Sequence, residues 1–248
     1  MDNATYVALS LAQSMRRDLD VTSNNIANAN TAGFKGEHMR FESYVHKGGA
    51  DNGGKDISFV AEAGSWTDDA QGALTQTGNA LDVAVLGTGW MAYRVEGNQT
   101  AYGRDGRLTV DADGTLITLS GIPVLDTGGS HISIPQGAGD IEIARDGTMS
   151  GALTGPIARI GVFDLPDLQA YDRLGDGLLI RRTPGGTPPA PATRTDVVQG
   201  SIENSNVQPV VEMTRLMEVQ RAYERAISLM NGSDELRQDT LSRLGRVS

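Results

Sequence analysis

The sequence contains no cysteine. Disulfide bonds, zinc–thiolate sites and cysteine nucleophiles are therefore excluded. It also lacks any run of about 18 consecutive apolar residues, so we expect no transmembrane helix and no insertion into a membrane. Basic side chains are the minority, with 21 Lys and Arg against 31 Asp and Glu, and the formal net charge is −10 at pH 7. Since affinity for a phosphate backbone comes from Lys and Arg, we expect no binding to nucleic acid.

Aromatic residues make up only 5% of the 248 residues, whereas glycine is abundant at 31. Many turns and few large apolar anchors indicate short strands rather than the dense core of an α/β enzyme. The charge is uneven, because residues 1–46 and 199–248 each carry a net charge of −1 and residues 47–198 carry −8. This distribution is expected if both ends pack closely and the centre faces water.

The N-terminal stretch predicts an amphipathic helix over residues 3–28. Its apolar face consists of small and medium side chains at spacings of mostly three and four: Ala4, Ala8, Leu11, Met15, Leu19, Thr22 and Ile26. A seam this thin does not hold a lone helix in water, so the helix needs a partner. The start, Met1-Asp2-Asn3, lacks the basic region of a secretory signal peptide, so we expect any export to leave this end uncleaved.

The C-terminal stretch has a sharper, heptad-like seam. Its members are Met213, Leu216, Gln220, Tyr223, Ile227 and Met230. The pattern predicts a helix from about residue 207 to 230 that continues to about 244, with a weak joint at Gly232. Taken alone, both terminal seams fit core helices of one globular domain about as well as a coiled coil. Their position at the two termini favours the terminal coiled coil.

Between the helices the hydrophobic period changes to two. Strands are expected at residues 81–86, 90–95, 107–110, 115–119, 131–134, 141–144, 148–149 and 157–163. Turns are expected at residues 111–114 and at Asp146-Gly147, and residues 183–191 predict an extended linker. The predicted fold is a mainly β central domain, a short-stranded barrel or sandwich, flanked by N- and C-terminal α-helices that form a coiled-coil-like pair.

The expected organisation has five parts. They are an N-terminal helix (1–31), an extended connecting region (32–71), a β-rich domain (72–183), a Pro/Gly linker with a return segment (184–206) and a C-terminal helix (207–248).

No catalytic or cofactor-binding constellation is found. The stretch from Gly87 to Ala92 fits G-x-G-x-x-A, but Gly97-Asn98 follows too soon for the helix that dinucleotide binding requires. The three histidines form no H-E-x-x-H motif, and no G-x-S-x-G nucleophile elbow exists. We therefore expect a protein that is not an enzyme and has no cofactor and no metal.

Four asparagines crowd the end of the N-terminal helix: Asn24, Asn25, Asn28 and Asn30. Asn is a good cap and turn residue, and Gly33 fits a left-handed helix stop, so a polar C-cap is one interpretation. A stop needs only one Asn, however. Because side-chain amides both donate and accept hydrogen bonds, a row of them also suits a helix end that bonds to neighbouring chains.

Several stretches, in order, resemble the bacterial flagellar basal-body rod and hook family. The Asn-rich stretch 24–35 is similar to the family's N-terminal motif, and residues 72–90, 102–108 and 121–125 are similar to its central motifs. Residues 199–207 and 220–224 are similar to its C-terminal motifs. The resemblance covers nearly the whole chain. The short length and the start Met1-Asp2-Asn3-Ala4 are most similar to the proximal-rod branch, whereas Trp90-Met91 stands where the family prefers Phe-like residues.

The resemblance implies a structural subunit of the flagellar basal-body rod. It implies export in unfolded form through the flagellar type III export apparatus, and helical assembly across the periplasm to transmit torque. The implied partners are further copies and other rod subunits. The expected assembly interface comprises Leu11, Met15, Asn24, Asn25, Ile26, Asn28, Asn30, Gly33, Phe34, Met213, Leu216, Gln220, Tyr223, Ile227 and Met230.

Two alternatives remain open at this point. One is a distal-rod or hook-type axial protein of the same family. The other, from a different class, is a secreted β-domain binding module whose terminal helices merely form a small bundle.

Overall fold

The computed structural model describes residues 3–46, 57–182 and 187–244. Parts of the predicted connecting region (47–56) and linker (183–186), together with Met1-Asp2 and residues 245–248, lie outside the described residues. The chain forms two compact units. The helical unit contains Met1–Ala27, Glu37–Trp66 and Gln208–Ser248, and the β unit contains Asn28–Gly36 and Thr67–Val207. Each unit is therefore built from segments that are not contiguous in the sequence.

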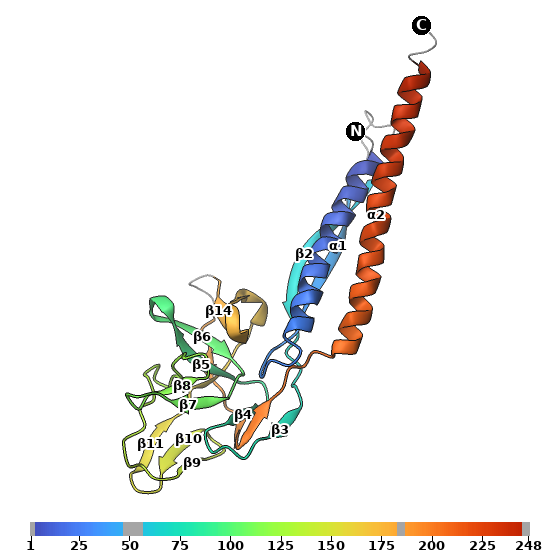
Figure 1. The fold of residues 1–248 in the computed structure, drawn as a ribbon. Helices are drawn as coiled ribbons and strands as arrows, with labels where there is room; N and C mark the ends of the chain where they lie inside the picture. Colours follow the sequence, from blue (N-terminus) through green and yellow to red (C-terminus); the bar gives the residue numbers. More distant parts are fainter. Residues whose placement is uncertain (1–2, 47–56, 183–186, 245–248) are drawn as a thin grey trace. The chain divides into compact units, whose positions relative to one another are not determined.

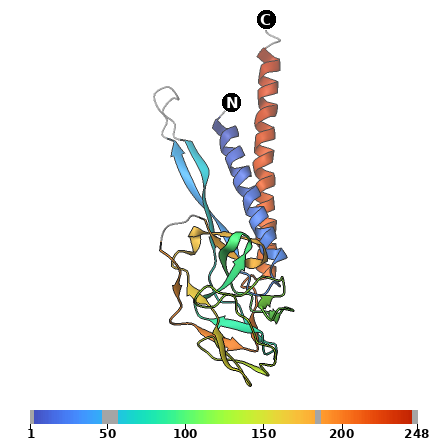
Figure 2. The same ribbon diagram turned by 90° about the vertical axis from the view of Figure 1, so that its left-hand side faces the viewer.

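The helical unit is built on two antiparallel helices, α1 (Asn3–Ala27) and α2 (Pro209–Leu244), which lie side by side (Figures 1 and 2). Its strands β1 (Glu37–His46) and β2 (Ile57–Thr67) form a two-stranded sheet, and β1 packs against α1. These strands lie in the region that we predicted to be an extended connection. Neither helix in the described part of the chain is apolar enough over a sufficient length to cross a membrane.

Helix α2 begins at Pro209, where the missing amide donor costs nothing, and it runs without interruption through Gly232. The weak joint predicted at Gly232 is therefore not a break. One glycine costs about 1 kcal/mol relative to alanine in a helix, and a helix of 36 residues continues through it.

The face between the helices is made of small and polar side chains. On α1 the buried positions are Ala8, Ala12, Ser14, Asp18, Thr22 and Asn25. On α2 they are Glu212, Val219 and Ala226. The heptad spacing that we predicted on α2 is present, but the buried positions lie one residue before Met213, Gln220 and Ile227. The face of α1 is small and polar, so it packs against Ala226 and forms a hydrogen bond with Glu212 through Asn25. The larger apolar side chains of α2 therefore lie beside this contact.

The β unit contains fifteen short strands among the described residues: β3 (Leu74–Gln76), β4 (Val83–Leu86), β5 (Trp90–Val95), β6 (Gln99–Gly103), β7 (Leu108–Val110), β8 (Leu116–Thr118), β9 (Ile141–Ile143), β10 (Thr148–Gly151), β11 (Gly155–Arg159), β12 (Val162–Asp164), β13 (Tyr171–Arg173), β14 (Leu179–Arg181), β15 (Ala190–Pro191), β16 (Asp196–Gln199) and β17 (Ser201–Glu203).

These strands do not close into a barrel. Of the two predicted architectures, a barrel or a sandwich, the barrel is therefore wrong. The largest sheet is open, with the order β13-β14-β6-β5-β12-β15, and a three-stranded sheet has the order β11-β10-β9. The pairs β16-β4, β17-β3 and β7-β8 form separate two-stranded sheets. Strands of two to six residues bounded by glycine turns are too short to propagate one continuous ladder around a cylinder.

Several predicted strands and turns are confirmed. The segment 90–95 is β5, and the hairpin expected around residues 111–114 is β7-β8, with Gly114 at φ 85°. Residues 131–134, by contrast, form only isolated bridges, such as Leu125↔His131. The G-x-G-x-x-A stretch leads directly into strand β5 at Trp90, so it has no helix to face a pyrophosphate.

One core joins these small sheets. Its fully buried side chains come from strands of the different sheets and from the segments between them, and include Val83, Met91, Tyr93, Leu116, Val124, Ile132, Met149 and Ile160. A second cluster on the other face of β5 holds Trp90, Tyr102, Leu125, Tyr171 and Leu179. Because β5 is buried on both faces, it is the central strand of the unit.

Candidate assembly site

Asn25 joins the end of α1 to the first residue of β1. Its Nδ2 donates to the Glu37 carbonyl at 2.8 Å, and its Oδ1 accepts the Glu37 N–H at 3.0 Å. The amide thus satisfies both backbone groups of Glu37 as a neighbouring strand would. Nδ2 also lies 3.3 Å from Oε2 of Glu212 on α2, and Asn25 is only 1% exposed. One buried side chain therefore ties three elements of the helical unit together.

A second polar cluster lies further along the same helix pair. Asp18 Oδ1 accepts a bond from Arg215 Nη2 at 3.1 Å, and Arg215 Nη1 lies 2.9 Å from Nδ1 of His38. Because a guanidinium only donates, Nδ1 of His38 accepts, which places the ring proton on Nε2. Trp66 on β2 lies against His38, with ring centroids 5.1 Å apart. Burial raises the pKa of the Asp18 carboxyl, and Arg215 offsets part of that effect.

The segment after α1 belongs to the β unit. The Gly33 N–H donates to the Glu203 carbonyl at 2.7 Å. Gly33 has φ +67°, and a Cβ there would lie 2.2 Å from the carbonyl carbon of Arg104. Only glycine fits such an approach of two backbones. The adjacent Phe34 is buried, and the Arg173 guanidinium lies 4.6 Å above its ring.

Lys35 enters a buried charge cluster beside this turn. Its Nζ lies 2.7 Å from Glu203 Oε1, and Arg104 Nη1 lies 3.1 Å from Glu203 Oε2. All three side chains are at most 2% exposed. The Gly72 N–H also donates to Glu203 Oε1, and the Arg104 guanidinium lies over the Trp90 ring. Burial lowers the pKa of the Lys35 ammonium more than Glu203 raises it.

This cluster holds the ends of the β unit together. Two cations share one carboxylate, so loss of Glu203 would leave both uncompensated in a buried site. Lys35 lies 168 residues before Glu203 in the sequence. The turn after α1 is therefore fixed to the last strand of the β unit.

The predicted interface residues divide into two groups in the folded chain. Asn25, Gly33 and Phe34 are buried within it, and Asn28 accepts a bond from the Thr31 hydroxyl. The others lie on or near the surface of α1 and α2, except Asn30, which lies in the turn after α1. Half-buried side chains are Leu11, Met15, Ile26, Leu216, Tyr223, Ile227 and Met230. Exposed side chains are Asn24, Asn30, Met213 and Gln220.

Large apolar side chains stand exposed along α2. Val210 is 77% exposed, Met213 50% and Met217 51%, and their spacing of three and four places them on one face. Val211, Leu229 and Leu236 are also more than half exposed. We call Val210, Met213 and Met217 the α2 apolar face.

Sequence reasoning missed Asp18, His38, Arg104, Glu203, Glu212 and Arg215. Lys35 and Arg104 lie inside stretches that resemble family motifs, but the sequence indicated no interaction partner for either of them. No local pattern links them to a residue about a hundred or more positions away. A charged residue inside a strand, such as Glu203, was the one available signal. Among the described residues no cluster of three or more His, Cys, Asp or Glu could hold a metal ion.

Models of known families match three segments of the chain. Residues 6–35 match the flagella basal body rod protein family, and residues 84–151 match the flagellar hook protein FlgE/F/G D1 domain. Residues 198–244 match the C-terminal part of the flagellar basal body rod FlgEFG proteins.

Full-length relatives are also found. The flagellar basal-body rod protein FlgF of Caulobacter vibrioides is 40% identical, with 100% of each chain covered. FlgF of Mesorhizobium japonicum is 35% identical, again over 100% of both chains. The flagellar basal-body rod protein FlgG of Bacillus subtilis is 31% identical, over 98% of this chain and 99% of its own.

Proposed function

Because the chain belongs to the family of flagellar basal-body rod proteins, we propose that it enters the rod through its terminal helices. It is a structural subunit of the basal body rod, and the family is structural rather than enzymatic. Its partners are other components of that rod. The proposal concerns which surface makes those contacts and how the subunit reaches its place.

The FlgF type is favoured over the distal-rod and hook alternatives. The FlgF relatives of Caulobacter vibrioides and Mesorhizobium japonicum are 40% and 35% identical along their whole length, whereas the FlgG relative of Bacillus subtilis is 31% identical. A secreted binding module is disfavoured because matched segments include both helical ends as well as the β unit.

The α2 apolar face is the observation that carries the proposal. Val210, Met213 and Met217 are each at least half exposed in the single chain. Burying such side chains contributes about 1.5–3 kcal/mol each, which a neighbouring subunit would gain. The helices of adjacent subunits would pack in a coiled-coil-like manner, using the half-buried Leu11, Met15, Leu216 and Tyr223 at the edges of the contact.

Repetition of such a contact would generate the rod. A head-to-tail contact that does not close propagates as a helical filament. The helices would form its inner tube, and the β units, which include most of the strongly acidic central region, would face outward. Close-packed helices resist deformation, so a tube of this kind would transmit torque across the periplasm.

Export in unfolded form through the flagellar type III apparatus completes the proposal. It is supported by the family and by the absence of cysteine, because no disulfide has to be broken or formed during passage. The final location would be the rod of the basal body, reached without a cleaved signal peptide.

The test is a double substitution, Met213→Glu with Met217→Glu, in the full chain. Both side chains are about half exposed, so the monomer should keep its far-UV circular dichroism, while rod incorporation and swimming should be lost. Leu153→Glu is the control, because Leu153 is 80% exposed in the β unit. Normal swimming of the double variant would show that the α2 apolar face is not the contact.

A further inference from the structure

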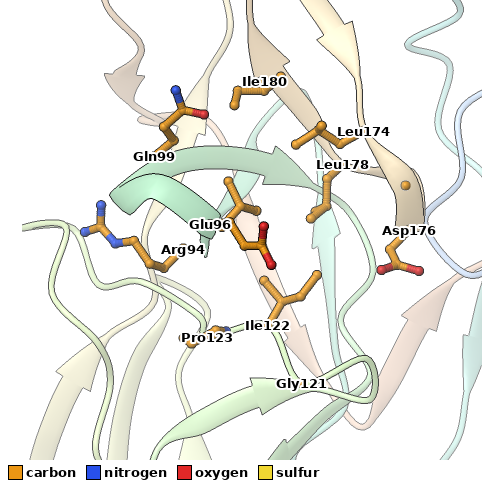
Figure 3. Close-up of a pocket in the computed structure, with 12 residues that line it drawn as sticks. Arg94, Glu96, Gln99, Gly121, Ile122, Pro123, Leu174, Asp176, Leu178 and Ile180 are labelled. Carbon is orange, nitrogen blue, oxygen red and sulfur yellow. The ribbon is translucent and has the colours of Figure 1, made fainter.

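A cavity of about 650 Å³ opens on the β unit (Figure 3). Its walls come from β5 and β6, from the turn at Gly121 and from the loop that leads into β14. The apolar part of the lining consists of Val95, Ile122, Pro123, Leu174, Leu178 and Ile180. Leu174 is 37% exposed, so part of this apolar lining is open to water.

Two carboxylates stand at this cavity without a cation. Glu96 and Asp176 are exposed, and neither forms an ion pair or side-chain hydrogen bond with any residue in the described ranges. In the view of Figure 3 the Glu96 carboxylate lies between Leu178 and Ile122, and Asp176 lies to the right of them. Both residues belong to short turns, so their backbone positions are fixed by the strands around them.

The cation that lines the cavity does not neutralise them. Arg94 Nη1 donates to the Asn98 carbonyl at 3.0 Å, and Nη2 donates to the Gly129 carbonyl at 2.5 Å. Its Nε is buried and has no hydrogen-bond partner among the described residues. In Figure 3 the guanidinium points away from the centre of the cavity. The lining therefore combines apolar side chains with two exposed carboxylates, and Arg94 forms no ion pair with either of them.

We propose that this cavity receives a lysine or arginine side chain of an adjacent rod subunit. Such a side chain has an aliphatic stem that packs on an apolar surface and a charged end that stays at the rim. The stem would lie on Ile122, Leu174 and Leu178, and the charge would lie between Glu96 and Asp176. An anionic side chain would be repelled, and a purely apolar one would leave both carboxylates uncompensated.

The inference rests on the proposed function, since the adjacent subunit exists only in the rod. It adds a contact that the helices do not provide. The central part of the chain, residues 47–198, carries a net charge of −8, so neighbouring β units repel each other. A basic side chain inserted from one subunit into the next would offset part of that repulsion.

The first experiment measures the chemistry of the cavity in the full chain. The probe is Nα-acetyl-arginine amide, and Nα-acetyl-norleucine amide is its uncharged counterpart. Methyl NMR signals of Ile122, Leu174 and Leu178 should shift with the arginine probe and much less with the norleucine probe. Glu96→Gln with Asp176→Asn should weaken arginine binding about tenfold, because two charge contacts are lost. The control Glu142→Gln, an exposed glutamate on β9, should bind as the wild type does. Equal shifts with both probes, or unchanged binding in the double variant, would overturn the proposal.

The second experiment places the cavity in the rod. Glu96→Lys with Asp176→Asn should leave the urea midpoint of the monomer unchanged, because Asn tolerates the φ of 58° at position 176. The same variant should reduce the swimming zone in soft agar to about half or less. Wild-type swimming would overturn the role in assembly. Failure here is separable from failure of the proposed function, because the Met213 and Met217 variant tests the helices alone and does not touch the cavity.

Discussion

At the scale of single side chains, Glu203 is the centre of the buried charge cluster in the β unit. It is 0% exposed and holds two cations, Lys35 and Arg104, that come from distant parts of the sequence. It also accepts the Gly72 N–H. The net attraction within such a buried cluster is small. The main effect of the carboxylate is that it keeps two buried cations from being left without a counter-ion.

Glu203→Gln should therefore destabilise the β unit by about 3 kcal/mol, because the amide keeps the shape of the side chain and removes the charge. Urea unfolding followed by Trp90 emission measures the loss, in a Trp66→Phe background that silences the second of the two tryptophans. Glu142→Gln removes an exposed charge of the same type and serves as the control. If both variants unfold at the same urea concentration, the cluster does not stabilise the unit.

Asp18 should give the helical unit a pH dependence. Burial raises the pKa of its carboxyl above the ordinary value of 3.8. Between that value and the higher folded value, the folded state binds more protons than the unfolded state, so the Asp18 contribution to stability falls as pH rises. Asp18→Asn keeps a side-chain oxygen that accepts the hydrogen bond from Arg215, and it removes the ionisable carboxyl group.

The measurement is the urea midpoint from far-UV circular dichroism at several pH values between about 4 and 7. As pH rises through the Asp18 titration, the midpoint of Asp18→Asn should improve relative to the wild type. Asp20→Asn, on the exposed face of the same helix, is the matched control. Parallel profiles for wild type and Asp18→Asn would contradict the assignment.

At the scale of elements, α2 presents two different faces. Glu212, Val219 and Ala226 face the rest of the helical unit, and the larger apolar side chains lie beside or opposite them. The residues of α2 that are buried in the single chain lie one position before the predicted seam residues Met213, Gln220 and Ile227. The prediction assumed that the partner of α2 presents an apolar face, whereas α1 presents a small and polar face that includes Asp18, Thr22 and Asn25.

Leu216→Asp and Tyr223→Asp should each leave the β unit folded and abolish rod incorporation. Both side chains are half-buried at the edge of the helix pair, so a carboxylate there costs about 1–3 kcal/mol locally and repels a packed neighbour. Trp90 emission reports the β unit, and swimming in soft agar reports assembly. Leu119→Asp, at a turn where the leucine is 64% exposed, provides the comparison. Swimming variants at both α2 positions would mean that these residues are not at the contact.

Elements whose apolar residues recur at a regular spacing could be predicted from the sequence. Helices α1 and α2 and the hairpin β7-β8 follow from apolar spacing and from a turn in which Gly114 takes a positive φ. The strands β1 and β2 were missed although Met39, Phe41 and Val45 alternate with polar residues. The Lys35–Glu203–Arg104 cluster could not be predicted, because it depends on contacts between residues that no period connects.

At the scale of the whole molecule, the chain passes between the two units four times, and the first of these boundaries lies at the end of α1. Ala27 ends the part of the chain that belongs to the helical unit, and Asn28–Gly36 belongs to the β unit. Two truncations that differ by nine residues should therefore differ in the stability of the β unit.

Deletion of residues 1–27 should remove α1 and leave the β unit with its full urea stability. Deletion of residues 1–36 also removes Phe34 and Lys35, so it should expose Arg173 and leave Glu203 with one cation, costing about 3 kcal/mol or more. Trp90 emission during urea unfolding distinguishes the two proteins. Identical stabilities would place Asn28–Gly36 outside the β unit. Neither truncated protein should enter the rod.

The pairing of early with late segments also determines when this chain can fold during its synthesis. Gly33 and Lys35 meet Glu203, β3 pairs with β17, and α1 lies against a helix that begins at Pro209. A ribosome must therefore translate past Glu203 before the β unit can close, and past Pro209 before the helical unit can. Until then the nascent chain holds only local turns and hairpins, since contacts across such long loops form last.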